Sequence, residues 1–184
     1  MSRPQEKACD IGAFESTFNG YWEVASDGGV FTFGDAPFFN SEGGQHLNKP
    51  IVGMASTPDG MGNWLTVANG AVFSYGDAGR YGDAAGQSLV GPVRAMAGTA
   101  SGHGYTLAAA GGGVFNFGDA GFFGSMGGQP LNGPVTDLAT TNDGQGYWLF
   151  ATDGGVFSFG DARFSGLMVG RPPNVPVVRG TTPG

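Results

Sequence analysis

Charged residues are scarce in this 184-residue chain. Asp, Glu, Lys and Arg make up 12% of it, and 15 acidic against 8 basic residues give a formal net charge of −7. Such a chain repels a negatively charged phosphate backbone, and its few cations form no basic patch to attract one. Nucleic-acid binding is therefore excluded as a leading function.

Cysteine and long apolar runs are scarce as well. Cys9 is the single cysteine, so the chain contains no internal disulfide and its redox compartment stays open. No apolar run approaches the ~18 residues of a membrane-spanning helix, so no membrane insertion is expected. The start of the chain has no apolar signal core, and an exported protein would carry its signal upstream of this sequence.

Glycine, by contrast, is abundant. The 37 glycines are about one residue in five, against a usual share of ~7%. The chain is also 40% hydrophobic, with 15 Phe, 5 Tyr and 3 Trp, which suffices for a packed core that a disordered glycine-rich tail lacks. This composition predicts one globular domain with many turns.

A repeat of 42 residues organises the sequence. Segments of the type GGVFSFGDA occur four times, with their valines at Val30, Val72, Val114 and Val156. An aromatic run such as GYWLFATD precedes each segment, a Pro-led run such as PIVGMAST lies before three of them, and a short run follows each GDA. Runs of this length, rich in Val and aromatics and ending in Asp-Gly, Asn-Gly or Gly-Gly, are typical of strands joined by hairpin turns that need a positive φ. The chain is predicted to be all-β, with four strands per repeat.

Four strands in about 40 residues is the size of a propeller blade. We therefore expect a four-bladed β-propeller over residues 16–184, with residues 1–15 as a tail or linker. A β-trefoil would show a three-fold pattern, and a β-helix would have a shorter coil. A monomer is expected, and an eight-bladed ring made by two chains remains the alternative.

The two ends of the chain are predicted to meet in the first blade. The Pro-led run begins at Pro50, Pro92, Pro134 and Pro176, whereas residues 8–15, at the corresponding place before the first copy, lack it. The C-terminal run is thus expected to supply the innermost strand of the first blade, which would close the ring and leave no long edge exposed.

Two segments resemble known families. GYWLFATDGGVFSFGDA and PIVGMASTPDG resemble a repeat found in many copies in large secreted proteins of actinobacteria, often beside hydrolase domains. The resemblance covers roughly residues 20–184 and implies an accessory β-propeller-like module of a longer exported protein, outside the cell or on its surface, without implying a reaction. SRPQEKACDIGAFE is similar to the end of choice-of-anchor right-handed β-helix domains, which implies that residues 2–15 are the tail of a preceding domain.

A third resemblance concerns two turns. TPDGMGNW from Thr57 and TNDGQGYW from Thr141 have the Thr, Asp and Trp spacing of the Asp-box turns of sialidase-type propellers. Their glycines are displaced by one place, and the other two copies lack the aspartate. The resemblance therefore implies a similar turn without sialidase activity.

The most regular polar residue of the repeat is the aspartate of Gly-Asp-Ala, which occurs as Asp35, Asp77, Asp119 and Asp161. An aspartate there can accept backbone N–H groups in an Asx-turn and fix the corner between the third and fourth strands. Calcium would need about 6–8 oxygen ligands, which one aspartate per blade does not supply. We predict a structural turn role, with no metal or other cofactor.

Aromatic residues of the second run are weak candidates for ligand contact. Their rings could stack on a sugar, although alternation along a strand also points one of each pair into the core between blades, and packing is the stronger interpretation. The candidates are Tyr21, Trp22, Trp64, Tyr147 and Trp148. The aromatic residues of the third run are predicted to be core: Phe31, Phe73, Phe115 and Phe157, with Phe33, Tyr75, Phe117 and Phe159.

No catalytic constellation is recognised. His46 and His103 occupy unrelated repeat positions in glycine-rich loops, and no Glu recurs. We expect a non-catalytic extracellular module for binding or display, with polysaccharide or cell-wall glycan as the candidate ligand. The alternatives are a glycan-acting enzyme with a site at the propeller mouth, and a structural spacer or assembly unit. Asp137 and Arg179, at one repeat position of neighbouring innermost strands, are predicted to approach each other.

Overall fold

The computed structural model describes residues 19–166 and 176–180, and in these ranges every regular element is a strand. The eleven strands are β1 (Tyr21–Val24), β2 (Val30–Phe33), β3 (Ile51–Ser56), β4 (Gly62–Val67), β5 (Val72–Gly76), β6 (Val93–Gly98), β7 (Gly104–Ala109), β8 (Val114–Gly118), β9 (Val135–Thr140), β10 (Gly146–Ala151) and β11 (Val156–Gly160). The prediction of an all-β fold is confirmed for this part of the chain. The predicted tail, residues 1–15, lies outside it.

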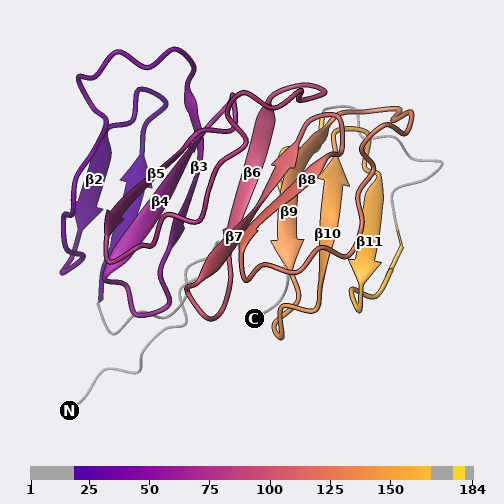
Figure 1. Cartoon of the computed structure of the whole chain (residues 1–184). Coiled ribbons are helices and arrows are strands. Elements are labelled where there is room, and N and C mark those ends of the chain that lie inside the picture. Colours follow the sequence, from indigo (N-terminus) through magenta and orange to yellow (C-terminus); the bar gives the residue numbers. More distant parts are fainter. Residues whose placement is uncertain (1–18, 167–175, 181–184) are drawn as a thin grey trace.

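The strands form four antiparallel sheets that follow one another in chain order (Figure 1). The first sheet pairs β1 with β2, and the other three have the orders β3-β4-β5, β6-β7-β8 and β9-β10-β11. In each three-stranded sheet the Pro-led run, the aromatic run and the GDA run are neighbours, so each sheet corresponds to one copy of the repeat.

The predicted fourth strand of each repeat is not formed. The runs after Gly-Asp-Ala, at 37–41, 79–83, 121–125 and 162–166, are irregular. Glycine and proline are frequent in these runs and weaken strand pairing. Side chains hold them instead, as described below for the tryptophans.

The hairpins differ in detail from the expected two-residue turns. Gly28, Gly70, Gly112 and Gly154 have φ values of 89°, 88°, 79° and 84°, but no non-glycine residue in the described ranges has a positive φ. In the first hairpin the Gly28 amide donates to the Ala25 carbonyl at 2.9 Å, and Ala25 donates to Gly29 at 2.8 Å. The turn is therefore a tight turn followed by a left-handed glycine, which is a common longer hairpin connection.

The core lies between successive sheets. One cluster joins the second and third sheets through Trp64, Val93, Tyr105 and Leu107, and two further clusters join the first to the second and the third to the fourth. Every residue of β4 and β7 is buried. Burial of one large apolar side chain contributes roughly 1.5–3 kcal/mol, so the sheet-to-sheet contacts supply most of the stabilisation.

The first sheet departs from this pattern. Phe31 and Phe33 are 55% and 40% exposed, and Tyr21 is 53% exposed. The prediction that Phe31 and Phe33 are core is therefore wrong in this structure, because no sheet in the described part of the chain covers their face. Their equivalents in the second, third and fourth sheets, among them Phe115 and Phe157, pack against core clusters.

The C-terminal segment 176–180 lies against the fourth sheet. The Val177 amide donates to the Thr152 carbonyl at 3.0 Å. Equivalent backbone bonds connect β3, β6 and β9 to their preceding sheets. The amides of Ile51, Val93 and Val135 donate to the carbonyls of Ser26, Ala68 and Ala110, each at 2.9 Å. The segment thus occupies the place of the next innermost strand, while β1 pairs with β2 alone among the described residues.

Candidate functional site

The tryptophans of the aromatic run tie each sheet to the irregular run that follows it. Trp22 Nε1 donates to the Pro37 carbonyl at 2.8 Å, Trp64 Nε1 to Gly79 at 2.7 Å and Trp148 Nε1 to Arg163 at 2.9 Å. The acceptors are 15 residues downstream in all three copies. An indole N–H therefore anchors the run where no strand ladder does.

The five aromatic candidates separate into two groups. Trp64 and Tyr147 are 0% and 1% exposed, so neither ring has a face open to a ligand. Trp22 and Trp148 are half-buried, and Tyr21 is exposed and stacks on Phe33 with ring centroids 4.8 Å apart. Only Tyr21, Trp22 and Trp148 keep surface that a ligand could contact.

In the third copy an asparagine side chain makes the hydrogen bond that the tryptophan makes in the other copies. Thr106 stands in the tryptophan position, and the Asn116 side-chain amide donates to the Gly121 carbonyl at 2.6 Å and to Thr106 Oγ1 at 3.1 Å. The other copies have Thr32, Ser74 and Ser158 where this one has Asn116. The anchor after Gly-Asp-Ala is therefore kept in every copy.

The residue that follows the anchored carbonyl is the feature that sequence reasoning missed. Phe38, Phe122 and Phe164 occupy this one repeat position and are 59%, 62% and 56% exposed. In the second copy the position holds Arg80, which forms an ion pair with Asp83 at 3.1 Å. The runs PFF, GFF and ARF contain these aromatic residues. Their exposure was not predicted, because a strand in these runs would have pointed aromatic side chains into the core. We call Phe38, Phe122 and Phe164 the rim phenylalanines.

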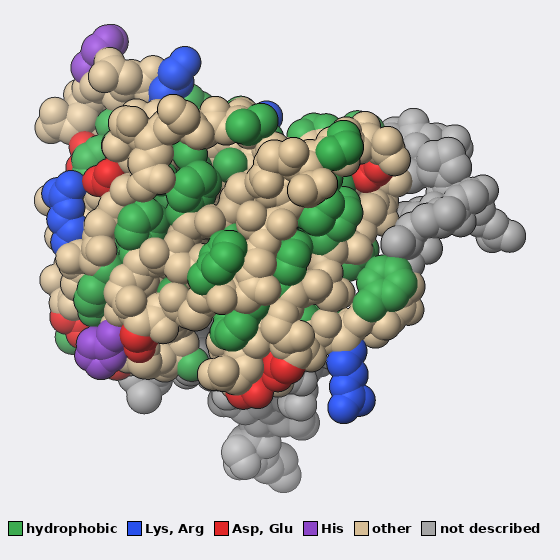
Figure 2. Space-filling view, turned by 45° about the vertical axis from the view of Figure 1, so that its right-hand side comes forward, with side chains coloured by type: hydrophobic (Ala, Val, Ile, Leu, Met, Phe, Trp, Pro, Cys, Tyr) green, Lys and Arg blue, Asp and Glu red, His purple; other side chains and the backbone are tan. Residues whose placement is uncertain are grey.

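Apolar side chains are separated from one another on the face shown in Figure 2. They stand singly or in small groups among polar side chains and backbone, and charged groups are few and dispersed. Isolated exposed aromatics of this kind suit several small contacts better than one large protein interface.

The Gly-Asp-Ala aspartates are turn residues whose bonding partners differ from the expected ones. Thr57 Oγ1 lies 3.2 Å from Asp77 Oδ1, and Thr99 Oγ1 lies 2.9 Å from Asp119 Oδ1. Ser101 Oγ also donates to Asp119 Oδ2 at 2.5 Å. Asp119 thus accepts two hydroxyl groups from a neighbouring turn. Asp77 lies beside the Thr57 hydroxyl, whose single proton has a closer acceptor in Asp59, at 2.8 Å. No side-chain partner of Asp35 lies in the described ranges.

The Asx-turns belong to other aspartates. Asp59 Oδ1 accepts the Met61 amide and Asp143 Oδ1 accepts the Gln145 amide, each at 3.1 Å. Thr57 and Thr141 donate to the same two carboxylates at 2.8 Å. These are the two turns that resemble Asp-boxes in sequence.

Hydrogen bonding and burial act oppositely on the two carboxylates that share Thr57. The Met61 amide and the Thr57 hydroxyl lower the pKa of Asp59. Burial and the neighbouring Asp59 carboxyl raise the pKa of Asp77. In the third copy the Ser101 hydroxyl and then Thr99 lower the pKa of Asp119. In the described part of the chain, no three His, Cys, Asp or Glu side chains lie close enough to hold a metal ion together.

A cavity of about 320 Å³ is lined by one residue from each of four Pro-led runs: Val52, Arg94, Thr136 and Val178. These four share a single repeat position. At the next position Arg179 Nε lies 3.4 Å from Asp137 Oδ2, which confirms the predicted approach of these two residues. The Gly180 amide donates to the same oxygen at 3.1 Å.

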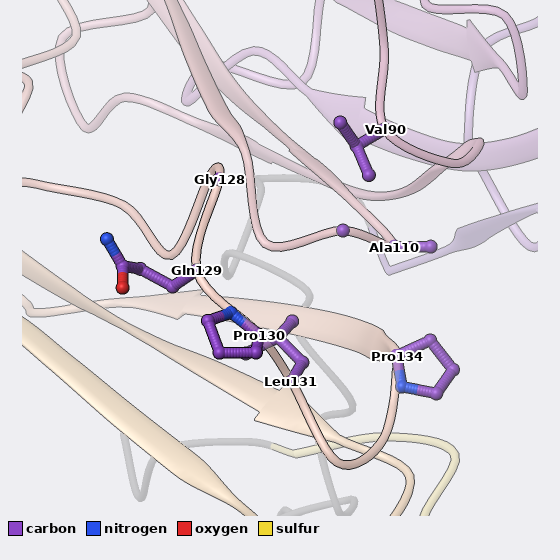
Figure 3. Close-up of a pocket in the computed structure, with 8 residues that line it drawn as sticks. Val90, Ala110, Gly128, Gln129, Pro130, Leu131 and Pro134 are labelled. Carbon is purple, nitrogen blue, oxygen red and sulfur yellow. The ribbon is translucent and has the colours of Figure 1, made fainter.

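A second hollow of about 550 Å³ lies between the connections of the third and fourth sheets. Figure 3 shows Val90 and Ala110 across the opening from Pro130, Leu131 and Pro134, with Gln129 extending away from them. Its lining is almost entirely apolar, and it offers no group that would orient a polar ligand.

No protein-family model matches the chain, and no curated protein matches its sequence. Within the described ranges there is no helix with the length and apolar character needed to cross a membrane.

Proposed function

We propose that this chain is a non-catalytic extracellular β-propeller module that binds polysaccharide through aromatic side chains displayed on successive blades. The observation that carries the proposal is the set of rim phenylalanines, each more than half exposed and each next to an anchored carbonyl. Three of the four copies expose the same large apolar side chain at the same repeat position, and this repetition supports an interaction role. A flat aromatic ring also fits the apolar C–H face of a sugar ring.

Neighbouring tryptophans extend two of these sites. Trp22 bonds the residue before Phe38, and Trp148 bonds the residue before Phe164, so each indole anchors the backbone that carries a rim phenylalanine. Both indoles keep some exposed surface. We therefore assign the strongest contacts to the first and fourth blades, with Phe122 as a smaller third site.

A polymeric ligand suits this arrangement. Each ring alone would bind weakly, but several sites on one rigid scaffold act together on a chain of repeating sugars, because later contacts become intramolecular. The buried layers between sheets keep the spacing of the sites fixed.

The proposed scaffold is a closed four-bladed ring whose first blade is completed by the C-terminal strand. The position of Val177 on Thr152 supports it, as does the convergence of four equivalent residues around one cavity. Further support comes from the seam between the fourth and first sheets. Between the second and third sheets Tyr105 donates to the Gly82 carbonyl, and between the third and fourth sheets Tyr147 donates to Gly124 at 2.5 Å.

Both halves of the same contact are present at the open seam. Gly82 and Gly124 have φ values of 128° and 136° and lie against aromatic rings of the next sheet, and Gly166 has a φ of 119° with open space beside it. Tyr21 and Phe33 hold the receiving positions on the first sheet and are exposed. We propose that Gly166 packs on Phe33 and accepts a hydrogen bond from Tyr21. A monomer in size-exclusion chromatography is the expected result, and a dimer would favour the eight-bladed alternative.

The binding proposal is tested with an array of insoluble and soluble polysaccharides that includes chitin, cellulose, xylan and peptidoglycan. The wild type is compared with the triple variant Phe38→Ala, Phe122→Ala, Phe164→Ala. The matched control is Met61→Ala with Val90→Ala, which removes two exposed apolar side chains, 45% and 68% exposed, from other positions.

The triple variant is expected to bind at least about 100-fold more weakly, because avidity is lost with the separate sites. The control is expected to bind as the wild type does. Equal binding by all three proteins, or equal loss in both variants, would overturn the proposal. Release of reducing ends from a bound polysaccharide would favour the glycan-acting enzyme instead.

A further inference from the structure

Among the described residues that line the cavity between the Pro-led runs, one side chain is cationic. Of the four lining residues, Arg94 is charged, Thr136 is a hydroxyl and Val52 and Val178 are apolar. Arg94 is exposed, although Val93 and Ala95 on either side of it in β6 are buried. The repeat therefore places a guanidinium into this space at one position out of four, in a chain whose net charge is −7.

The nearest acidic residue along the same strands, Asp137, is already paired with Arg179. Asp137 is a buried residue, and one of its carboxylate oxygens accepts both Arg179 and the Gly180 amide. Within residues 19–166 and 176–180, Arg94 forms no ion pair. Arg80 differs in this respect, because it is paired with Asp83.

We propose that this cavity binds an organic anion of single-sugar size, with the Arg94 guanidinium holding its carboxylate or phosphate oxygens. The planar fork of guanidinium donors matches the geometry of two oxygens on one carboxylate or phosphate. The volume of about 320 Å³ falls at the lower end of the range for small-molecule sites, ~300–1,000 Å³.

The remaining walls suit the body of such a ligand. Thr136 Oγ1 makes only long hydrogen bonds, 3.3 Å to the Phe150 carbonyl and 3.4 Å to the Val177 carbonyl, so its lone pairs remain available to a ligand hydroxyl. Val52 and Val178 contribute apolar contact. This site depends on the position of segment 176–180 beside β9, which is also part of the proposed ring. It does not depend on the rim phenylalanines.

The test is isothermal titration at constant ionic strength with two pairs of probes. Glucuronate against glucose isolates the carboxylate, and glycerol phosphate against glycerol isolates the phosphate. The proteins are the wild type, Arg94→Gln, and Arg80→Gln as the control that removes one equal charge outside the cavity. Circular dichroism and thermal melting establish that all three are folded.

At least one anion is expected to bind the wild type at least about tenfold more tightly than its neutral counterpart does. The same anion is expected to bind Arg94→Gln at least about tenfold more weakly than the wild type, because hydrogen bonds to charged groups are the strong ones. Arg80→Gln is expected to match the wild type. Preference between glucuronate and glycerol phosphate identifies the anionic group. Equal binding by Arg94→Gln, equal loss in Arg80→Gln, or no binding of either anion would overturn the assignment.

The rim triple variant separates this site from the proposed function. It is expected to bind the anion as the wild type does, even if polysaccharide binding is lost. Loss of both activities in that variant would contradict the independence of the anion site in this cavity.

Discussion

Removal of residues 176–184 tests how the C-terminal segment is held. In the structure this deletion takes away the Val177 amide from Thr152, and both Gly180 and Arg179 from Asp137. The first bond contributes about 0.5–1.5 kcal/mol, and the amide bond to the carboxylate contributes about 1.5–3 kcal/mol. The Arg179 side chain is 64% exposed, so its ion pair contributes only about 0–1 kcal/mol.

The expected loss is thus about 2–5 kcal/mol, a large part of the roughly 5–15 kcal/mol that stabilises a typical domain. Urea unfolding followed by tryptophan fluorescence measures it. Size-exclusion chromatography at matched concentration detects aggregation through the edge of β1, which the proposed ring closure covers with this segment. The control deletes residues 1–10, which we predict to belong to the tail of a preceding domain, and it is expected to cost little. A monomeric truncated protein with wild-type stability would refute the assignment of this segment as a structural strand.

Three further predictions follow from single contacts. Asn116→Ala is expected to lower the free energy of unfolding by about 1–3 kcal/mol, because the hydrogen bond to the Gly121 carbonyl is lost. Ser158→Ala, at the same repeat position, should be near neutral, because that buried hydroxyl has no partner in the described ranges. Urea unfolding of the two variants measures the difference. Burial raises the pKa of Asp137, so its ionisation opposes folding, and the stability of the wild type relative to Asp137→Asn should fall as pH rises above about 4; a relative gain would contradict this. Chelation by EDTA should leave the melting temperature unchanged, because Asp119 accepts two hydroxyl groups from a neighbouring turn, and a fall of several degrees would refute a metal-free corner.

Much of the fold could be predicted from the sequence because its signals are local. Alternating aromatic and small residues specify β5 and β11, and glycine in the turns specifies the hairpins. The fourth run could not be read in this way, because its conformation depends on an indole or amide anchor 5 or 15 residues away. A short apolar run therefore suggested a strand where none forms.

The candidate site was harder to predict because burial depends on neighbouring sheets. Trp64 and Trp148 share one repeat position, yet the first is fully buried and the second is half-buried. Asp77 and Thr57 are 20 residues apart in the chain, so their contact has no local signal. Exposure of the rim phenylalanines likewise follows from the irregular run that carries them.

The most direct test of the binding proposal removes the rim rings one at a time. Affinity for the best polysaccharide of the array is measured for Phe164→Ala, for the double variant that adds Phe38→Ala, and for the triple variant. Separate sites acting together predict a stepwise loss, with each substitution weakening binding further and the triple variant weakest by about 100-fold or more. Affinity that stays at the wild-type value through all three steps, in proteins that melt as the wild type does, would contradict the assignment of the rim as the binding surface.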